Sequence, residues 1–279
     1  MASATTSAEI LRHTTAFTSE TLSQSKLRIR LLSALRRKLP TSDQNVLRQL
    51  NLAAETLENA ISTSSSFNRS SSLRVAEKLL HSHPDTLFSS FLLSLLYALL
   101  NRHTEAAHSL LNIFSSDPSL ARSEIAPVVF EEFFLIHLLP VLQSFKDQRS
   151  RILSSLSSKN LGYDSDKRSR FEESVVVSGT RLLSKMSGGQ TSELKELERD
   201  YEEVLDENCR LLVGYFREVL GNENGSRLIR PPSLIFEKTR KSDEFKFNED
   251  EQNKVEEIGL GNGRYNNVIF LQYIWFFFF

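Results

Sequence analysis

The sequence predicts an all-α protein, built as an irregular stack of antiparallel helices of the α-solenoid kind and followed by a disordered C-terminal tail. Leucine recurs at intervals of three and four residues over most of the chain, which is the spacing of one helical face. Only 10 glycines and 7 prolines interrupt the 279 residues, and serine-rich stretches separate the periodic segments. With 40% hydrophobic residues, the chain can fill a core.

Residues 1–40 are predicted to form an amphipathic, basic, helical N-terminal region that ends at Pro40. An organelle transit peptide is the alternative, because this region is rich in serine, threonine and basic residues. Glu9 and Glu20 argue against it, since transit peptides contain few acidic residues. Residues 1–10 also lack the apolar core of a secretory signal. The second half of the region has the spacing of an amphipathic helix with a solvated basic face. The residues with this spacing are Leu22, Ile29, Leu32, Leu35 and Leu39.

Residues 41–221 are predicted to form the helical domain itself. Side-chain caps support three helix starts: Ser42 or Asp43, Asp117 followed by Pro118, and Thr191 or Ser192. Segment 87–100 is apolar on all sides, as expected of a helix at the centre of a stack, and is shorter than the roughly 20 residues that span a bilayer. Helices are expected at about residues 43–61, 73–80, 87–100, 104–114, from 118, 127–145 and 191–220.

Antiparallel helices with short connections are typical of armadillo-like and related α-solenoids, and no regular repeat period is evident. Residues 222–279 are predicted to be a tail. Residues 222–264 are charged and poor in aliphatic side chains, which favours disorder. Residues 268–279 are almost wholly apolar and too few to cross a membrane as a helix. They are interpreted as an interfacial anchor, as a partner-binding tail or as translated non-coding sequence. We favour translated non-coding sequence, because an exposed aromatic run in a real product would promote aggregation.

The sequence contains no arrangement that predicts a catalytic site, a metal site, a cofactor or a small-molecule ligand. His81 and His83 lie two residues apart, and His103 and His108 lie five apart. Neither spacing places both rings on one helical face. His137 has apolar neighbours and no accompanying nucleophile motif, so we expect a core histidine with its hydrogen bonds satisfied rather than a general base.

Cys209 is predicted to be inert, because nearby acidic residues disfavour the thiolate. A single cysteine also fits a reducing compartment, so we expect a cytoplasmic or nuclear location. Residues 261–263 are not expected beside a strand or a helix and therefore do not form a phosphate-binding loop. The acidic residues are interpreted as a solvated helix face, with an acid–base pair as the alternative. They are Glu202, Glu203, Asp206 and Glu207.

The charge balance favours neither nucleic acid nor anionic lipid as a partner. The chain has 34 basic and 35 acidic side chains and a net charge of -1, so no overall field attracts either polyanion. No segment is predicted to span a membrane stably. Other proteins, bound on the surface of the helical stack, are therefore the expected partners.

Three segments carry a recognisable pattern of structural residues. They are residues 57–61, residues 114–127 with Asp117-Pro118, Arg122 and Ile125-Ala126-Pro127, and residues 194–211 with Tyr201, Leu205 to Asn208 and Arg210. This set resembles the N-terminal armadillo-like region of the LIN/Cerberus-type E3 ubiquitin ligases of plants, in order from about Val46 to Leu220. The resemblance implies the architecture of that family. There the helical region is followed by a U-box, which docks the ubiquitin-conjugating enzyme, and then by WD40 repeats.

The resemblance implies a non-catalytic protein-interaction domain of an E3 ubiquitin-protein ligase, linked to protein ubiquitination. The family belongs to the RING-type (U-box) E3 ubiquitin transferases. These ligases bring the conjugating enzyme next to the substrate and do not carry ubiquitin as a covalent thioester, so the resemblance implies no catalytic residue here. The chain ends before a U-box could begin, and its single tryptophan, Trp275, excludes a propeller of Trp-Asp blades within these residues. We therefore expect a truncated gene product. The alternative is a stand-alone helical scaffold without ligase activity.

Overall fold

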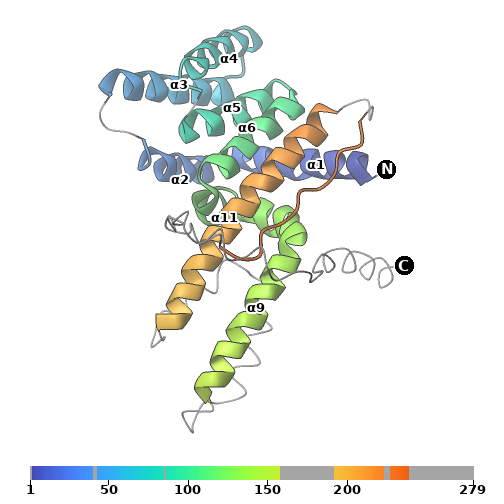
Figure 1. Cartoon of the computed structure of the whole chain (residues 1–279). Helices are drawn as coiled ribbons and strands as arrows, with labels where there is room; N and C mark the ends of the chain where they lie inside the picture. Colours follow the sequence, from blue (N-terminus) through green and yellow to red (C-terminus); the bar gives the residue numbers. More distant parts are fainter. Residues whose placement is uncertain (1, 40–42, 85, 158–191, 223–226, 239–279) are drawn as a thin grey trace, which may run out of the picture. The chain divides into compact units, whose positions relative to one another are not determined.

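The computed structural model describes residues 2–39, 43–84, 86–157, 192–222 and 227–238 (Figure 1). All the described residues belong to one compact unit, Met1–Lys238. All regular elements among the described residues are helices, which confirms the all-α prediction. The predicted loop at 261–263 and the apolar run at 268–279 lie outside the described residues.

Four helices form two antiparallel hairpins (Figure 1): α3 Gln44–Ser62 with α4 Ser66–His81, and α5 Leu87–Leu99 with α6 His103–Ser116. The hairpins stack through α4 and α5. Asp43 caps α3 as predicted, because its side chain accepts hydrogen bonds from the amides of Asn45 and Val46. Thr86 caps α5 by accepting from the amide of Ser89. All ten residues from Phe88 to Tyr97 are buried, so α5 is the central helix that its composition predicts.

Helix α1 (Ala2–Ser23) packs against α5, α6 and α11 and lies in the N-terminal region predicted to be helical, but the apolar spacing that supported that prediction begins only at Leu22, so a separate helix over these residues was not predicted. Its buried stripe is rich in threonine, with Thr14, Thr18 and Thr21 each at most 3% exposed. The hydroxyl of Thr18 donates to the Thr14 carbonyl at 3.0 Å, and that of Thr21 donates to the Phe17 carbonyl at 2.8 Å. The helix thus satisfies these hydroxyls internally, which leaves the threonine methyl groups free to pack.

Helix α2 (Ser25–Arg36) is the predicted amphipathic helix, but one of its basic residues is not on a solvated face. Arg28 is buried at 5% exposure, and its guanidinium pairs with Glu58 of α3 at 2.5 Å. It also donates to the carbonyl of Thr21 at 3.1 Å. The guanidinium is therefore fully engaged where α1, α2 and α3 meet, because a buried charge needs both a counter-ion and hydrogen bonds.

The chain then winds through short helical segments into a long helix. Asp117 caps the first of them by accepting from the amide of Leu120 at 2.9 Å, with Pro118 in the first turn, as predicted. Two turns are π-helical and lie on either side of Pro127. The helix predicted at 127–145 therefore contains a π turn and continues to Ser157. The segments are α7 Pro118–Leu120, η1 Ala121–Ile125, α8 Pro127–Val129, η2 Phe130–Phe134 and α9 Leu135–Ser157.

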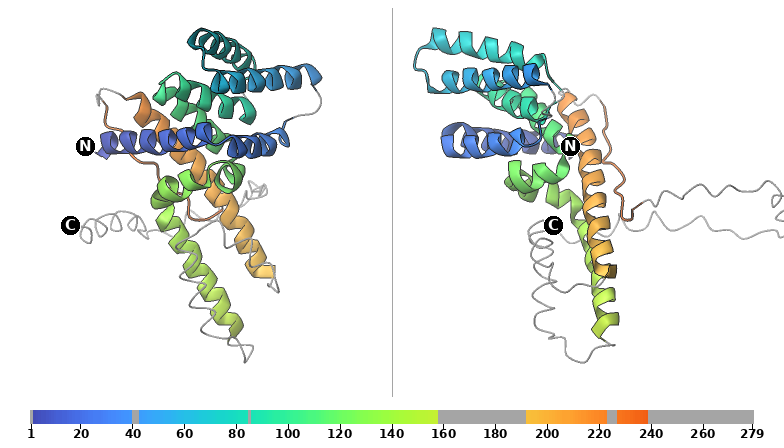
Figure 2. Two further views of the ribbon diagram at one scale, coloured as in Figure 1. Left: turned by 180° about the vertical axis from the view of Figure 1, so that it is seen from behind. Right: turned by 90° about the vertical axis from the view of Figure 1, so that its left-hand side faces the viewer.

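Helix α11 (Ser192–Gly221) runs beside α9 and also packs on α6 (Figure 2). An aromatic cluster holds η2 where these helices meet. Phe114 of α6 stacks on Phe134 of η2 with ring centroids 4.4 Å apart, and Phe216 of α11 lies 4.7 Å from Phe133 and 5.3 Å from Phe134. These contacts fix the position of η2. They therefore also fix the orientation of the side chains on the exposed side of η2.

Residues 227–238 form an extended segment along α11 (Figure 1). Asn208 of α11 is fully buried, and its side-chain Nδ2 donates to the Ile235 carbonyl while its Oδ1 accepts from the Ile235 amide, both at 2.8 Å. Lys238 pairs with Glu203 at 2.6 Å. The expectation of disorder over 222–264 is therefore wrong for this segment, because a buried side-chain amide supplies the hydrogen bonds that a neighbouring strand would otherwise provide.

The helical run Pro127–Ser154 is the one part of the described chain that is long and apolar enough to cross a membrane by length and composition. The core helix of a globular protein passes the same test, and 50% of the apolar window of this run is buried within the protein. Phe134 and Leu138 of the run are fully buried in the main core cluster. Packing in the core therefore explains the apolar composition of this run.

Candidate interaction surface

An apolar stripe, formed by Val128, Ile136 and Leu139, lies exposed on α8 and α9. These side chains are 53%, 64% and 43% exposed. Two turns of α-helix span about seven residues, and the extra residue of the π turn η2 makes this eight. Val128 and Ile136 are eight positions apart and therefore lie on the same side. Three large aliphatic side chains on one side of a helical run make this stripe the candidate surface for binding another protein.

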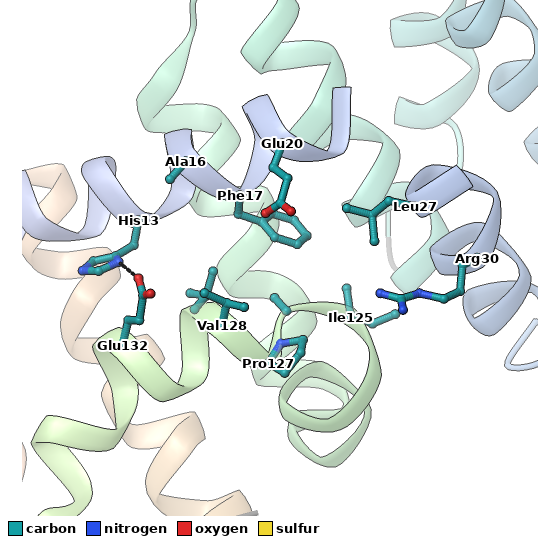
Figure 3. A pocket seen from close by; sticks show the side chains of 12 residues that line it. His13, Ala16, Phe17, Glu20, Leu27, Arg30, Ile125, Pro127, Val128 and Glu132 are labelled. Atoms are coloured by element: carbon teal, nitrogen blue, oxygen red, sulfur yellow. Dashed lines mark ion pairs between the residues drawn. The ribbon is translucent and has the colours of Figure 1, made fainter. Parts of the chain in front are cut away.

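A pocket opens at the Val128 end of the stripe, between α1–α2 on one side and η1, α8 and η2 on the other (Figure 3). Its volume is ≈ 140 Å³. Small-molecule sites have volumes of about 300–1,000 Å³, so this pocket suits a single side chain. Apolar groups from both walls line it: Phe17, Leu27, Ile125, Pro127 and Val128.

His13 forms part of the pocket wall and links α1 to η2 (Figure 3). It is 8% exposed, with Nδ1 3.3 Å from a Glu132 carboxylate oxygen and Nε2 2.9 Å from the Arg12 guanidinium. A guanidinium can only donate, so Nε2 accepts and the ring proton lies on Nδ1, which donates to Glu132. This assignment, made from the partners, gives a neutral His13 that holds the Glu132 carboxylate beside the pocket.

Three charged side chains line the pocket, and none of them pairs with an aspartate, glutamate, lysine or arginine among the residues that the structure describes. Glu20 accepts a hydrogen bond from the neutral side chain of Gln24 at 3.2 Å, and Glu132 faces the neutral His13. Arg30 makes no hydrogen bond or ion pair within the described part of the chain. Two carboxylates and one guanidinium are thus available to a bound partner at this rim.

The structure gives separate surroundings to the histidines considered as metal ligands. Nε2 of His81 lies 3.0 Å from the Tyr97 hydroxyl, and Nε2 of His83 lies 2.7 Å from the side-chain oxygen of Gln49. Burial lowers the pKa of His108. Among the residues that the structure describes, no three His, Cys, Asp or Glu side chains are grouped closely enough to hold a metal ion.

His137 lies in the aromatic cluster, with its ring centroid 5.3 Å from that of Phe133 and 5.2 Å from that of Phe216. Its apolar surroundings are as expected. Its Nε2 is buried without a hydrogen-bond partner in the described part of the protein, so the expectation of satisfied hydrogen bonds is wrong. Burial lowers the pKa of His137, and the carboxylate of Glu9 partly opposes this effect. No nucleophile accompanies the ring in these contacts.

The thiol of Cys209 is fully buried, and burial raises its pKa to about 12. The carboxylates near it in the sequence are not simply a solvated face. Glu202 and Asp206 both pair with Arg122, which is 2% exposed, and so neutralise a buried guanidinium. Sequence reasoning missed this role of Arg122, because its Asp206 partner is 84 positions away. This network joins η1 to α11 and is structural.

Comparison with known proteins gives matches that all name LIN-type E3 ubiquitin-protein ligases. Residues 86–234 match the family described as "E3 ubiquitin-protein ligase LIN-like, ARM repeat". Two relatives from Lotus japonicus, "Putative E3 ubiquitin-protein ligase LIN-1" and the corresponding LIN-2, are each 28% identical over 210 residues, which is 69% of this chain and 14% of theirs. "Putative E3 ubiquitin-protein ligase LIN" of Medicago truncatula is 29% identical over 202 residues, which is 66% of this chain and 13% of its own.

The chain therefore spans about 14% of the length of these curated relatives. No solved structure matches it. The family match covers the helices from α5 to α11 and most of the extended segment, and it includes the whole apolar stripe. The α1 and α2 wall of the pocket lies before the matched residues.

Proposed function

Because the chain belongs to the family of LIN-like E3 ubiquitin-protein ligases with ARM repeats, we propose that it is the non-catalytic, partner-binding region of such a ligase. ARM repeat domains generally mediate protein–protein interaction. In this role the helical surface holds a protein close to a U-box that lies elsewhere in the ligase, and the bound protein receives ubiquitin. The chain itself contributes binding and no chemistry.

The exposed stripe is the observation that carries this proposal. Val128, Ile136 and Leu139 lie within the family match and leave large aliphatic side chains in water, which has a cost of about 25 cal/mol for each Å² of apolar surface that a partner could cover. The apolar side chains on the opposite side of the same part of α9, such as Leu138, Val141 and Leu142, pack into the protein core. A binding surface explains why this face remains apolar.

The state of the thiol supports the non-catalytic part of the proposal. Ubiquitin ligases that carry ubiquitin as a thioester need an accessible cysteine that ionises near neutral pH. The single cysteine of this chain, Cys209, is fully buried, and burial raises its pKa to about 12. It is unsuited to that reaction.

A reconstituted ubiquitination assay tests the proposal. The chain alone, with activating enzyme, conjugating enzyme and ubiquitin, is expected to give no ubiquitin transfer. A fusion of the chain to a U-box is expected to modify proteins that bind the chain, and Ile136→Arg in the fusion should abolish that modification while leaving self-ubiquitination intact. Val75→Arg is the matched control, since Val75 is an aliphatic residue exposed at 47% on α4, outside the stripe. Transfer by the chain alone, or equal modification by both variants, would contradict the proposal.

A further inference from the structure

The stripe and the pocket form one continuous linear surface with a definite pattern of charge. Val128 belongs to both, so the pocket is the end of the stripe rather than a separate site. We propose that this surface binds an amphipathic helix of a partner protein, with a basic residue beside the apolar face of that helix. This inference rests on the proposed function and specifies the class of partner.

The geometry fits a helix. Val128 and Leu139 are eleven positions apart along a helical path, a rise of about 16 Å at 1.5 Å per residue. This length matches three turns of a partner helix, whose apolar residues at positions i, i+4, i+7 and i+11 form a stripe of similar length. The pocket of ≈ 140 Å³ receives one aliphatic side chain of that helix at the Val128 end.

The charges at the rim select a basic residue. Glu132 lies beside Val128 in the pocket, and its partner His13 is neutral because Arg12 occupies the other ring nitrogen. A lysine or arginine of the partner would meet this carboxylate and that of Glu20 without displacing an existing ion pair.

Arg30 gives the bound helix a direction. Figure 3 shows its guanidinium on the opposite side of the pocket from Glu132. Arg30 has no ion-pair or hydrogen-bond partner in the described part of the chain, so an acidic residue of the partner is expected at that side. The cation of the partner therefore lies toward Glu132 and its carboxylate toward Arg30.

Two synthetic helical peptides test the proposal with the intact chain. Both carry leucines at positions i, i+4, i+7 and i+11, and they differ only in having lysine or glutamate beside the leucines. The lysine peptide is expected to bind about tenfold more tightly at low salt, because each exposed pair changes affinity by a few-fold and two carboxylates contribute. Fluorescence anisotropy of the labelled peptides gives both dissociation constants.

Variants of the rim and the stripe make the result specific. Glu132→Lys combined with Glu20→Lys should reverse the preference in favour of the glutamate peptide, and Ile136→Ser should weaken both peptides. Circular dichroism confirms that each variant is folded. The proposal is overturned if neither peptide binds, if wild type binds both equally, or if light scattering shows a dimer that Ile136→Ser dissociates, which would assign the surface to a second copy of the chain.

The two proposals fail in different ways. If the peptides do not bind but Ile136→Arg still abolishes modification by the U-box fusion, the surface is a binding site and the helical class of partner is wrong. If the peptides bind as expected but the fusion modifies no bound protein, the class of partner stands and the link to ubiquitination is wrong.

Discussion

Replacing Asn208 with alanine is expected to release residues 227–238 from α11 while the helices remain folded. Asn208 is fully buried, and its side-chain amide makes two hydrogen bonds of 2.8 Å with the backbone of Ile235. Each bond contributes about 0.5–1.5 kcal/mol net, so their loss favours opening of the segment by about 1–3 kcal/mol, or about 5- to 150-fold. The buried Ile229 and the Lys238 ion pairs retain part of the attachment.

Amide hydrogen exchange followed by mass spectrometry measures this release directly. Peptides covering residues 227–238 should exchange faster in Asn208→Ala by a factor in that range, while peptides from α5 keep their protection. Asn208→Asp should exchange at least as fast, because its carboxylate faces the Ile235 carbonyl without a proton to donate. Asn59→Ala, on the exposed face of α3, is the control. Unchanged exchange of the segment in Asn208→Ala would refute the role given to this side chain.

Three further predictions concern the core. Phe134→Ala should destabilise the protein by about 3–5 kcal/mol in urea unfolding, whereas Phe67→Ala, at 81% exposure, should change stability by less than about 0.5 kcal/mol. Because burial raises the pKa of Cys209 to about 12, the thiol should react with maleimide only when denaturant unfolds the chain; rapid labelling of the native protein would contradict this. Burial lowers the pKa of His137 below its ordinary 6.5, so the unfolded chain binds more protons and stability falls as pH drops below about 6.5. His137→Phe should weaken this dependence, seen as a smaller shift of the urea midpoint between about pH 7.5 and 5.5.

The helices with apolar leucine stripes could be predicted because helix periodicity and capping are local properties of a sequence. Asp43 and Asp117 cap their helices as the sequence indicates. Helix α1 could not be predicted in this way, because threonines such as Thr18 occupy its buried face and their hydroxyls bond within the helix itself. The segment 227–238 was missed because Asn208, which holds it, lies 27 positions from its partner Ile235.

The candidate surface depends on contacts that no local pattern contains. Its pocket forms only when α1 and α2 face η1, α8 and η2, which are about a hundred positions away in the sequence. The spacing of Val128 and Ile136 does not match two ordinary helical turns, and only the π turn of η2 brings them to one side. The neutral state of His13 likewise follows from Arg12 and Glu132 together. The family resemblance gave the type of domain, and tertiary packing gave the position of the surface.

The most direct test of the binding surface is the footprint of a bound protein on this chain. Hydrogen exchange of the chain alone is compared with that of its complex with a purified protein that the U-box fusion modifies. Protection is predicted over η2, the first turns of α9 and the part of α1 that carries His13 and Glu20. Protection confined to the α3–α4 hairpin, with exchange around Ile136 unchanged, would contradict the account.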